Sequence, residues 1–164
     1  MKKVGIVMGS DSDLPVVRKA AEMLSALSVP YEVHVYSAHR TPDEARDFAR
    51  TAWEKGFGVL IAAAGMAAHL AGALAANTTL PVIGIPCQGP CLEVLDALLS
   101  TVQMPTGIPV ATVAVNGGAN AALLAAQILA VEDETLAGKL KEKRARDAAA
   151  VLEKDAGIMS RLEG

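Results

Sequence analysis

The sequence predicts an α/β fold in which helices cover both faces of a parallel sheet, because short β-rich runs alternate with amphipathic helical patterns along the chain. Its 164 residues suit one compact domain. Hydrophobic residues make up 52% of the chain and charged residues 20%, which indicates a globular protein. Aromatic residues make up only 3%, so small aliphatic side chains must build the core.

The predicted elements are given in chain order. We expect strands over residues 3–8, 31–36, 58–63, 81–85 and 110–115. We expect helices over residues 14–27, 41–56, 67–76, 92–102 and 119–130. The second helix has the clearest start, because Thr41-Pro42-Asp43-Glu44 has the form of a capping box with proline at the first helical position.

The middle of the chain carries very little charge. Between residues 56 and 131 only Glu93 and Asp96 are formally charged. Residues 57–76 are apolar enough to suggest a membrane span. The stretch is mostly alanine and glycine and contains His69, so we interpret it instead as a strand, a turn and a helix. A chain of this size has too little interior to hide so much neutral surface. We therefore expect much of it to face other subunits.

The composition changes abruptly near the C-terminus. Residues 1–131 are expected to form the α/β domain, and residues 132–164 a charged helical extension of the same domain, exposed or crossing to another subunit. Acidic residues are interspersed with its basic cluster, which indicates a solvated helix face. With a net charge of −3, we expect no nucleic-acid partner.

The N-terminal segment and the cysteines lead us to expect a cytoplasmic protein. The apolar run after Lys3 ends within about five residues and meets two aspartates, which is too short for a signal peptide. Cys87 and Cys91 are too few for a disulfide scaffold, and three scattered histidines do not complete a metal site. We expect two buried, reduced thiols and no bound metal.

Ligands of an open parallel sheet bind at the carboxyl ends of its strands, and three such ends are unusual here. After the first predicted strand, a helix begins with Gly9-Ser10-Asp11-Ser12-Asp13, and its free backbone N–H groups could hold a phosphate. One of the two aspartates could accept hydrogen bonds from ribose hydroxyls. Ordinary helix capping explains this segment equally well. It is neither a dinucleotide fingerprint nor a P-loop, since it has one glycine and no Gly-Lys-Ser.

The second strand end carries the best acid–base candidate. In Ser37-Ala38-His39-Arg40, the histidine can exchange protons near neutral pH and the arginine can grip a phosphate with two hydrogen bonds. A histidine at a helix start is often only a surface residue. The arginine beside it, next to an expected anion site, favours a functional interpretation.

The third strand end, residues 62–70, is rich in small residues. These would let a ligand touch the backbone, and the following helix start could hold a carboxylate. Tight packing between a helix and a strand explains the segment equally well. From their positions alone we take His69 as a core or interface residue and His34 as structural.

Together, six segments from residue 3 to residue 130 resemble the bacterial N5-carboxyaminoimidazole ribonucleotide mutases in order and spacing. They are Met8-Gly9-Ser10-Asp11-Ser12-Asp13, Ser37-Ala38-His39-Arg40-Thr41-Pro42, Ala67-Ala68-His69-Leu70, Leu80-Pro81-Val82-Ile83-Gly84, Val102-Gln103-Met104-Pro105 and Asn120-Ala121-Ala122-Leu123-Leu124-Ala125-Ala126. The second is close to a signature of that family.

This resemblance implies a flavodoxin-like three-layer sandwich with strand order 2-1-3-4-5, and a homo-octamer with active sites at subunit contacts. It implies a cofactor-free isomerase of purine biosynthesis that converts N5-carboxyaminoimidazole ribonucleotide to 4-carboxy-5-aminoimidazole ribonucleotide. The string Ala67-Ala68-His69-Leu70 resembles the mutase branch rather than the branch that carboxylates aminoimidazole ribonucleotide directly. Direct carboxylation remains an alternative, as does a non-catalytic sensor of nucleotide phosphates.

The resemblance also implies roles for individual residues. The first motif would hold the nucleotide through Ser10 and Asp13, with Gly9 and Ser12 nearby. The second would supply the catalytic His39 and the phosphate-binding Arg40. The remaining predicted substrate-binding residues are Ser37 and Ala38, which would line the site, and Gly65, Ala67, Ala68, His69 and Leu70, which would wrap the base and its carboxylate.

The chain departs from the family pattern in two places. Met66 and Ala71 stand where the third motif of the family has a glycine and a proline. The segment Cys87 to Val94 also differs from the usual small, polar stretch, so we carry no contacts over to it. Met66 is expected either to narrow the pocket or to turn into an interface.

Overall fold

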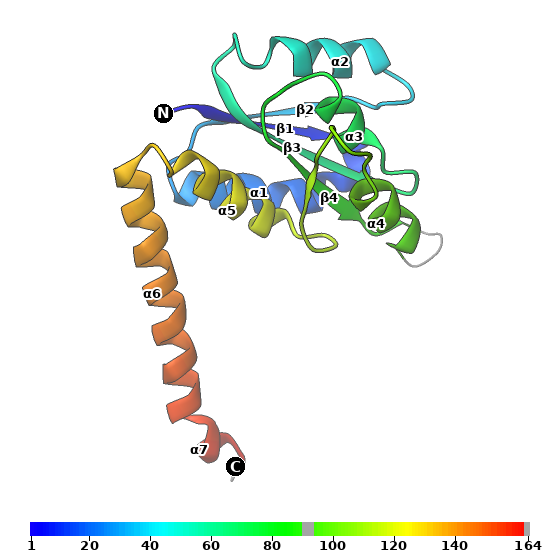
Figure 1. Cartoon of the computed structure of the whole chain (residues 1–164). Helices are drawn as coiled ribbons and strands as arrows, with labels where there is room; N and C mark the ends of the chain where they lie inside the picture. The colour runs from blue at the N-terminus through cyan, green and yellow to red at the C-terminus, as the bar shows by residue number, and fades with distance from the viewer. Residues whose placement is uncertain (90–93, 163–164) are drawn as a thin grey trace.

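The computed structural model describes residues 1–89 and 94–162 and has the predicted α/β architecture (Figure 1). Five parallel strands form one sheet in the order β2-β1-β3-β4-β5, which confirms the order implied by the resemblance. The strands are β1 (Lys3–Met8), β2 (Tyr31–Val35), β3 (Phe57–Gly65), β4 (Val82–Cys87) and β5 (Ala111–Thr112).

Helices cover both faces of the sheet (Figure 1). On one face lie α1 (Leu14–Ala26), which follows the short 3-10 helix η1 (Asp11–Asp13), and α5 (Gly118–Leu129). On the other lie α2 (Pro42–Thr51), α3 (Leu70–Ala75) and α4 (Leu95–Val102).

Alternation along the strands divides the core into two layers. On β1, Ile6 packs with α1 and α5, whereas the next residue, Val7, packs with α2 and α3. Both faces of the strand are therefore buried, which explains why β1 carries no polar side chain from Val4 to Met8. Alanines fill much of both layers, as the low aromatic content predicted.

The capping box predicted at the start of α2 does not form. The Thr41 side chain makes no cap hydrogen bond to the helix. Its Oγ1 turns back instead, accepts from the Ser37 N–H at 2.8 Å and donates to the Ser37 carbonyl at 3.2 Å. The threonine therefore closes the loop before the helix. The helix also ends at Thr51 rather than near Gly56, and turns fill the interval.

Strand β5 is much shorter than predicted because of Pro86 in β4. The Val113 N–H still reaches the Gly84 carbonyl at 3.1 Å, but Pro86 has no N–H to offer the next position of the ladder. The chain bulges away and returns where the Asn116 N–H reaches the Pro86 carbonyl at 3.0 Å.

Two helix starts also differ from the prediction. Helix α3 begins at Leu70 rather than near Ala67. The N–H groups of Ala68 and His69 are used in tight 2.8 Å bonds to the carbonyls of Met66 and Ala67, two residues earlier in each case. The predicted start of α4 at Leu92 falls outside the described residues, in which α4 begins at Leu95.

The C-terminal region forms α6 (Glu134–Ala156) and α7 (Ile158–Leu162). The Asp133 carboxylate caps α6 by accepting from the Leu136 N–H at 2.9 Å, and Leu136 is buried against the α1–α5 layer. Lys139 Nζ donates to the Leu27 carbonyl at 3.0 Å. Beyond this anchor the helix projects away from the domain (Figure 1).

The apolar stretch at residues 57–76 folds as β3, a turn and α3, as predicted. Throughout residues 1–89 and 94–162, no helix has both the length and the apolar character needed to cross a membrane.

Candidate functional site

A pocket of about 510 Å³ opens at the carboxyl ends of the central strands. Segments that follow β1, β2, β3 and β4 form its walls, which is the position expected for a ligand site in a doubly wound sheet. Its lining comprises Gly9, Ser10, Ser12, Asp13, Ser37, Ala38, His39, Arg40, Ala64, Gly65, Met66, Ala67, Leu70, Gln88 and Gly89.

The pocket brings together every predicted site residue except Ala68 and His69. Ala68 is buried behind the wall, and its carbonyl accepts a long 3.4 Å hydrogen bond from the Thr101 hydroxyl. His69 is exposed outside the pocket, and its ring covers Gly72, where an added Cβ would lie 2.6 Å from the His69 Cε1 atom. These two residues therefore shape the turn from outside the cavity.

The first wall is a serine-capped turn. Ser10 Oγ accepts from the Ser12 N–H at 3.3 Å, and the two serine hydroxyls are 3.0 Å apart. The Asp13 N–H is bonded to the Ser10 carbonyl at 3.1 Å. The capping that the sequence allowed for does form at this turn, where Ser10 accepts hydrogen bonds from the N–H groups of Ser12 and Asp13. The hydroxyls of Ser10 and Ser12 remain as the polar groups of this wall.

A buried polar pair lies beneath the first wall. Burial raises the pKa of the Asp13 carboxyl, an effect that hydrogen bonds from the Cys87 thiol and the Ser10 backbone partly oppose. Burial, followed by the proximity of Asp13, raises the pKa of the Cys87 thiol to about 12. Cys87 therefore keeps its proton, which has two acceptors in reach, Asp13 and the Ile85 carbonyl at 3.6 Å.

This finding confirms one of the two cysteine predictions. Cys87 is a buried free thiol, whereas Cys91 lies outside the described residues.

The second wall is a closed turn that presents His39 and Arg40. Ser37 Oγ accepts from the backbone N–H groups of His39 at 3.3 Å and Arg40 at 3.1 Å. Thr41 ties the far end of the turn back to Ser37 through its own N–H at 2.9 Å. The backbone is fixed while the imidazole and the guanidinium remain exposed, so both can reach a ligand in the pocket.

The third wall is the turn after β3. Gly65 is packed closely against β4, since an added Cβ would lie 3.1 Å from the Cys87 carbonyl oxygen. Met66 follows with a left-handed backbone, φ 54°, and a half-exposed side chain. The family's glycine at this place, noted above, would adopt such a φ without strain.

Sequence reasoning missed Gln88 and Gly89, which line the pocket after β4. The Asn116 side-chain carbonyl holds this segment by accepting from the Gln88 N–H at 3.0 Å. The signal was available, because every carboxyl end of a parallel sheet faces the same edge. The unusual Cys87 to Val94 sequence concealed it.

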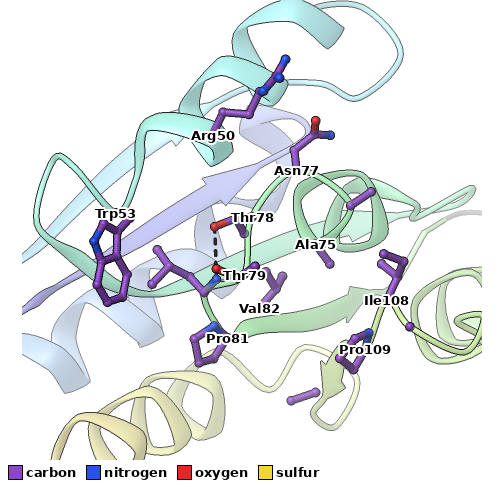
Figure 2. A pocket seen from close by; sticks show the side chains of 14 residues that line it. Arg50, Trp53, Ala75, Asn77, Thr78, Thr79, Pro81, Val82, Ile108 and Pro109 are labelled. Carbon is purple, nitrogen blue, oxygen red and sulfur yellow. Dashed lines mark hydrogen bonds between the residues drawn. The ribbon is translucent and has the colours of Figure 1, made fainter.

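A larger hollow of about 1070 Å³ lies at the opposite end of the strands, beside the starts of β4 and β5 (Figure 2). Figure 2 shows Arg50 and Trp53 on one side of it and Ile108 and Pro109 on the other. None of its lining residues is a histidine, cysteine, aspartate or glutamate, so it offers no acid–base group. The smaller pocket is therefore the candidate active site.

Metal ligands do not gather in the described part of the chain. Among those residues, no three histidine, cysteine, aspartate or glutamate side chains lie close enough to hold an ion together.

The fold belongs to the flavodoxin-like α/β class, and its pocket places a histidine and an arginine beside serine hydroxyls at the carboxyl ends of the strands. Comparison with known proteins places it more narrowly: the family model described as AIR carboxylase matches residues 3–150. This chain belongs to the AIR carboxylase family.

Named relatives agree with this assignment. The N5-carboxyaminoimidazole ribonucleotide mutase of Pyrococcus abyssi is 57% identical over 144 residues, which cover 88% of this chain and 83% of the relative. The enzyme of the same name from Thermotoga maritima is 53% identical over 154 residues, covering 94% and 90%. A crystal structure of a Treponema denticola PurE2 variant superposes with a TM-score of 0.85 at 28% identity, covering 95% and 98%.

Proposed function

We propose that this protein is an N5-carboxyaminoimidazole ribonucleotide mutase, an isomerase of purine biosynthesis. The observation that carries the proposal is the meeting of His39 and Arg40 with the Ser10–Asp13 turn and the small-residue turn after β3 in one pocket. The names of relatives more than half identical to this chain support the same substrate.

The walls divide the substrate among themselves. In this proposal, Arg40 and the hydroxyls of Ser10 and Ser12 hold the phosphate, and the Asp13 carboxyl accepts from a ribose hydroxyl. Ser37, Ala38 and Gly9 line the part of the pocket between the phosphate and the base. The imidazole base and its carboxylate lie against Gly65, Ala67 and Leu70, with Ala68 and His69 shaping that turn from outside.

The reaction needs one proton shuttle and no external electron source. His39 donates a proton to the exocyclic nitrogen as the N–C bond of the carbamate breaks and releases carbon dioxide. The electron-rich ring carbon then attacks carbon dioxide, forming the C–C bond, and His39 takes the ring proton back. The ring supplies the electron pair, so we propose that no cofactor or metal takes part.

The assembly is proposed to be a cytoplasmic homo-octamer. In the single chain, Leu95, Leu99 and Val102 on α4 and Val33 and Val35 on β2 are exposed. Apolar surface of this kind is typical of subunit interfaces. A small-molecule nucleotide is the proposed ligand, without nucleic-acid or membrane partners.

The test is an assay of His39→Asn with N5-carboxyaminoimidazole ribonucleotide, without ATP, metal or added bicarbonate. We expect kcat to fall by at least about 10²-fold, because the proton shuttle is removed, while nucleotide binding persists. Glu44→Gln, an exposed change on neighbouring α2, is the control and should retain full turnover.

Substantial activity of His39→Asn would remove His39 from the central role. A wild-type enzyme that does not convert N5-carboxyaminoimidazole ribonucleotide but carboxylates aminoimidazole ribonucleotide at high bicarbonate would be the direct carboxylase and not the mutase. Nucleotide binding without either reaction would favour the sensor.

A further inference from the structure

The turn after β3, to which the proposed function assigns the base and its carboxylate, uses part of its own hydrogen-bonding capacity. The N–H groups of Ala68 and His69 are bonded at 2.8 Å to carbonyls within the turn. The residues that line the pocket from this turn have no N–H or O–H group in their side chains, and they are Ala64, Gly65, Met66, Ala67 and Leu70. A carboxylate that leaves water for this part of the pocket therefore calls for a side-chain donor from another wall.

The wall after β4 brings such a donor next to the turn. Strands β3 and β4 are paired with Gly65 opposite Cys87, so Gln88 comes directly beside the start of the turn. The two segments are in close contact, since an added Cβ at Gly89 would lie 3.3 Å from the Met66 Cγ atom. Gln88 is exposed and lines the pocket. Its side-chain amide carries two N–H donors and one acceptor oxygen.

The other polar side chains of the lining serve other parts of the substrate in the proposed function. They hold the phosphate, the ribose or the transferred proton, and they are Ser10, Ser12, Asp13, His39 and Arg40. A neutral donor is also well suited to the carboxylate, because this group loses its charge when carbon dioxide is released. A cation beside it would stabilise the charged substrate more than the neutral intermediate and would raise the barrier.

Asn116 fixes the position of Gln88. Its Oδ1 atom accepts from the Gln88 N–H at 3.0 Å, and its own N–H donates to the Pro86 carbonyl at 3.0 Å, so it holds the chain on both sides of Cys87. The Asn116 backbone has a φ of 55°, a left-handed conformation that asparagine adopts more readily than most residues. Its carbonyl accepts from the Gly118 N–H at 2.9 Å, which ties this wall to the start of α5.

We propose that Gln88 recognises the migrating carboxylate through its side-chain amide, and that Asn116 is the positioning residue that holds Gln88 beside the turn after β3. This inference rests on the proposed mutase function. Gln88 donates a hydrogen bond to a carboxylate oxygen before and after the migration, while the proton shuttle stays with His39. Its polar side chain also agrees with the polar stretch that the family usually has at this place.

Two nucleotides that differ only in the carboxylate test the role of Gln88. Calorimetry on the full-length protein compares 4-carboxy-5-aminoimidazole ribonucleotide with aminoimidazole ribonucleotide. We expect Gln88→Ala to lower the affinity ratio of the first over the second about tenfold, which corresponds to about 1.4 kcal/mol, because a hydrogen bond to a charged group is lost. The affinity for aminoimidazole ribonucleotide should stay within about twofold of wild type.

A change of charge at the same position sharpens this test. Gln88→Glu replaces the donor with a second carboxylate, so the affinity ratio should fall further than in Gln88→Ala, because like charges repel. Gln127→Glu is the matched control: Gln127 is exposed on α5 outside the pocket, and its substitution should leave the ratio unchanged.

Three further variants test the role of Asn116. Asn116→Gly keeps the left-handed backbone but removes the acceptor, and we expect the affinity ratio to fall about threefold. Asn116→Asp keeps an acceptor oxygen at the same place and should restore the wild-type ratio. In a Gln88→Ala background, Asn116→Gly should lower the ratio no further, because Asn116 acts through the Gln88 side chain. A merely structural role would weaken both nucleotides equally.

An unchanged ratio in Gln88→Ala, or an equal loss of affinity for both nucleotides, would overturn the role of Gln88 and leave the mutase proposal intact if wild type is active. Full additivity of Gln88→Ala and Asn116→Gly would overturn the role of Asn116. A wild-type protein that binds neither nucleotide and converts no substrate would refute both proposals together.

Discussion

Asp13 combines opposing demands on one side chain. Its carboxyl lines the pocket, where the proposed function needs an acceptor for a ribose hydroxyl, yet burial raises its pKa. An Asp whose folded pKa is raised above the unfolded value contributes most stability below the unfolded pKa and loses it as pH rises through the folded pKa. At neutral pH, burial of the Asp13 carboxyl therefore lowers the free energy of unfolding.

Asp13→Asn should consequently be more stable than wild type at pH 7, because the buried charge is gone. We expect its Tm to exceed that of wild type by about 2–4 °C for each kcal/mol recovered. The advantage should shrink as pH falls towards the ordinary value of 3.8, where Asp13 is protonated in wild type too. Thermal melts between pH 7 and pH 4.5 measure this trend.

The same Asp13→Asn variant should bind nucleotide more weakly, since an amide offers one acceptor oxygen where the carboxylate offers two. Exposed Asp11→Asn, on the same turn, is the control for charge alone and should not gain stability in this way. A stability gap that stays constant with pH would contradict the account of the Asp13 pKa.

Contact between elements depends on very small residues. Helices α1 and α5 approach so closely that an added Cβ at Gly118 would lie 2.1 Å from the Val16 carbonyl oxygen. A backbone atom cannot rotate away as a side chain can. The absence of a side chain at Gly118 therefore sets the distance between the two helices on this face of the sheet.

Gly118→Ala is expected to destabilise the fold by roughly 1–3 kcal/mol, because the helices must separate. Gly138→Ala is the matched control: Gly138 lies within α6, and an added Cβ there would meet nothing within 4 Å. Alanine should stabilise that site by about 0.5–1 kcal/mol. Urea unfolding at equal protein concentration measures both, and equal effects of the two substitutions would refute the close packing of α1 on α5.

At the scale of the whole molecule, the single chain leaves apolar side chains exposed on several elements. Helix α6 is anchored to the domain near its start and then projects outward (Figure 1), with Val151 and Leu152 exposed along it. Leu99 on α4 is also exposed. Exposed apolar groups of this kind are typical of surfaces that other subunits cover, so we expect α6 and α4 to take part in the contacts of the proposed octamer.

Light scattering after gel filtration should therefore give about eight times the 16.9 kDa mass of the chain. Leu99→Glu should reduce this mass, because a charge would be buried at a subunit contact, while circular dichroism keeps the α/β signature. Glu22→Gln, exposed on α1, serves as the control and should leave the mass unchanged. A monomeric wild-type protein would contradict the octamer.

Much of this protein was determined by sequence alone. The alternation of elements predicted the sheet and its two helical layers. The position of His39 and Arg40 directly after a strand predicted that they lie at the carboxyl ends of the strands. Both predictions were possible because strand ends and helix starts are local properties of the sequence. The family resemblance supplied the strand order and the substrate.

Tertiary structure decided features that depend on residues far apart in the chain. Pro86 shortens β5 from the neighbouring strand, and Thr41 serves the loop rather than the helix. Asn116 positions Gln88, and Met66 lies against Gly89 from another strand end. These outcomes could not be predicted from local patterns, because hydrogen-bond partners and free space exist only once distant segments have met.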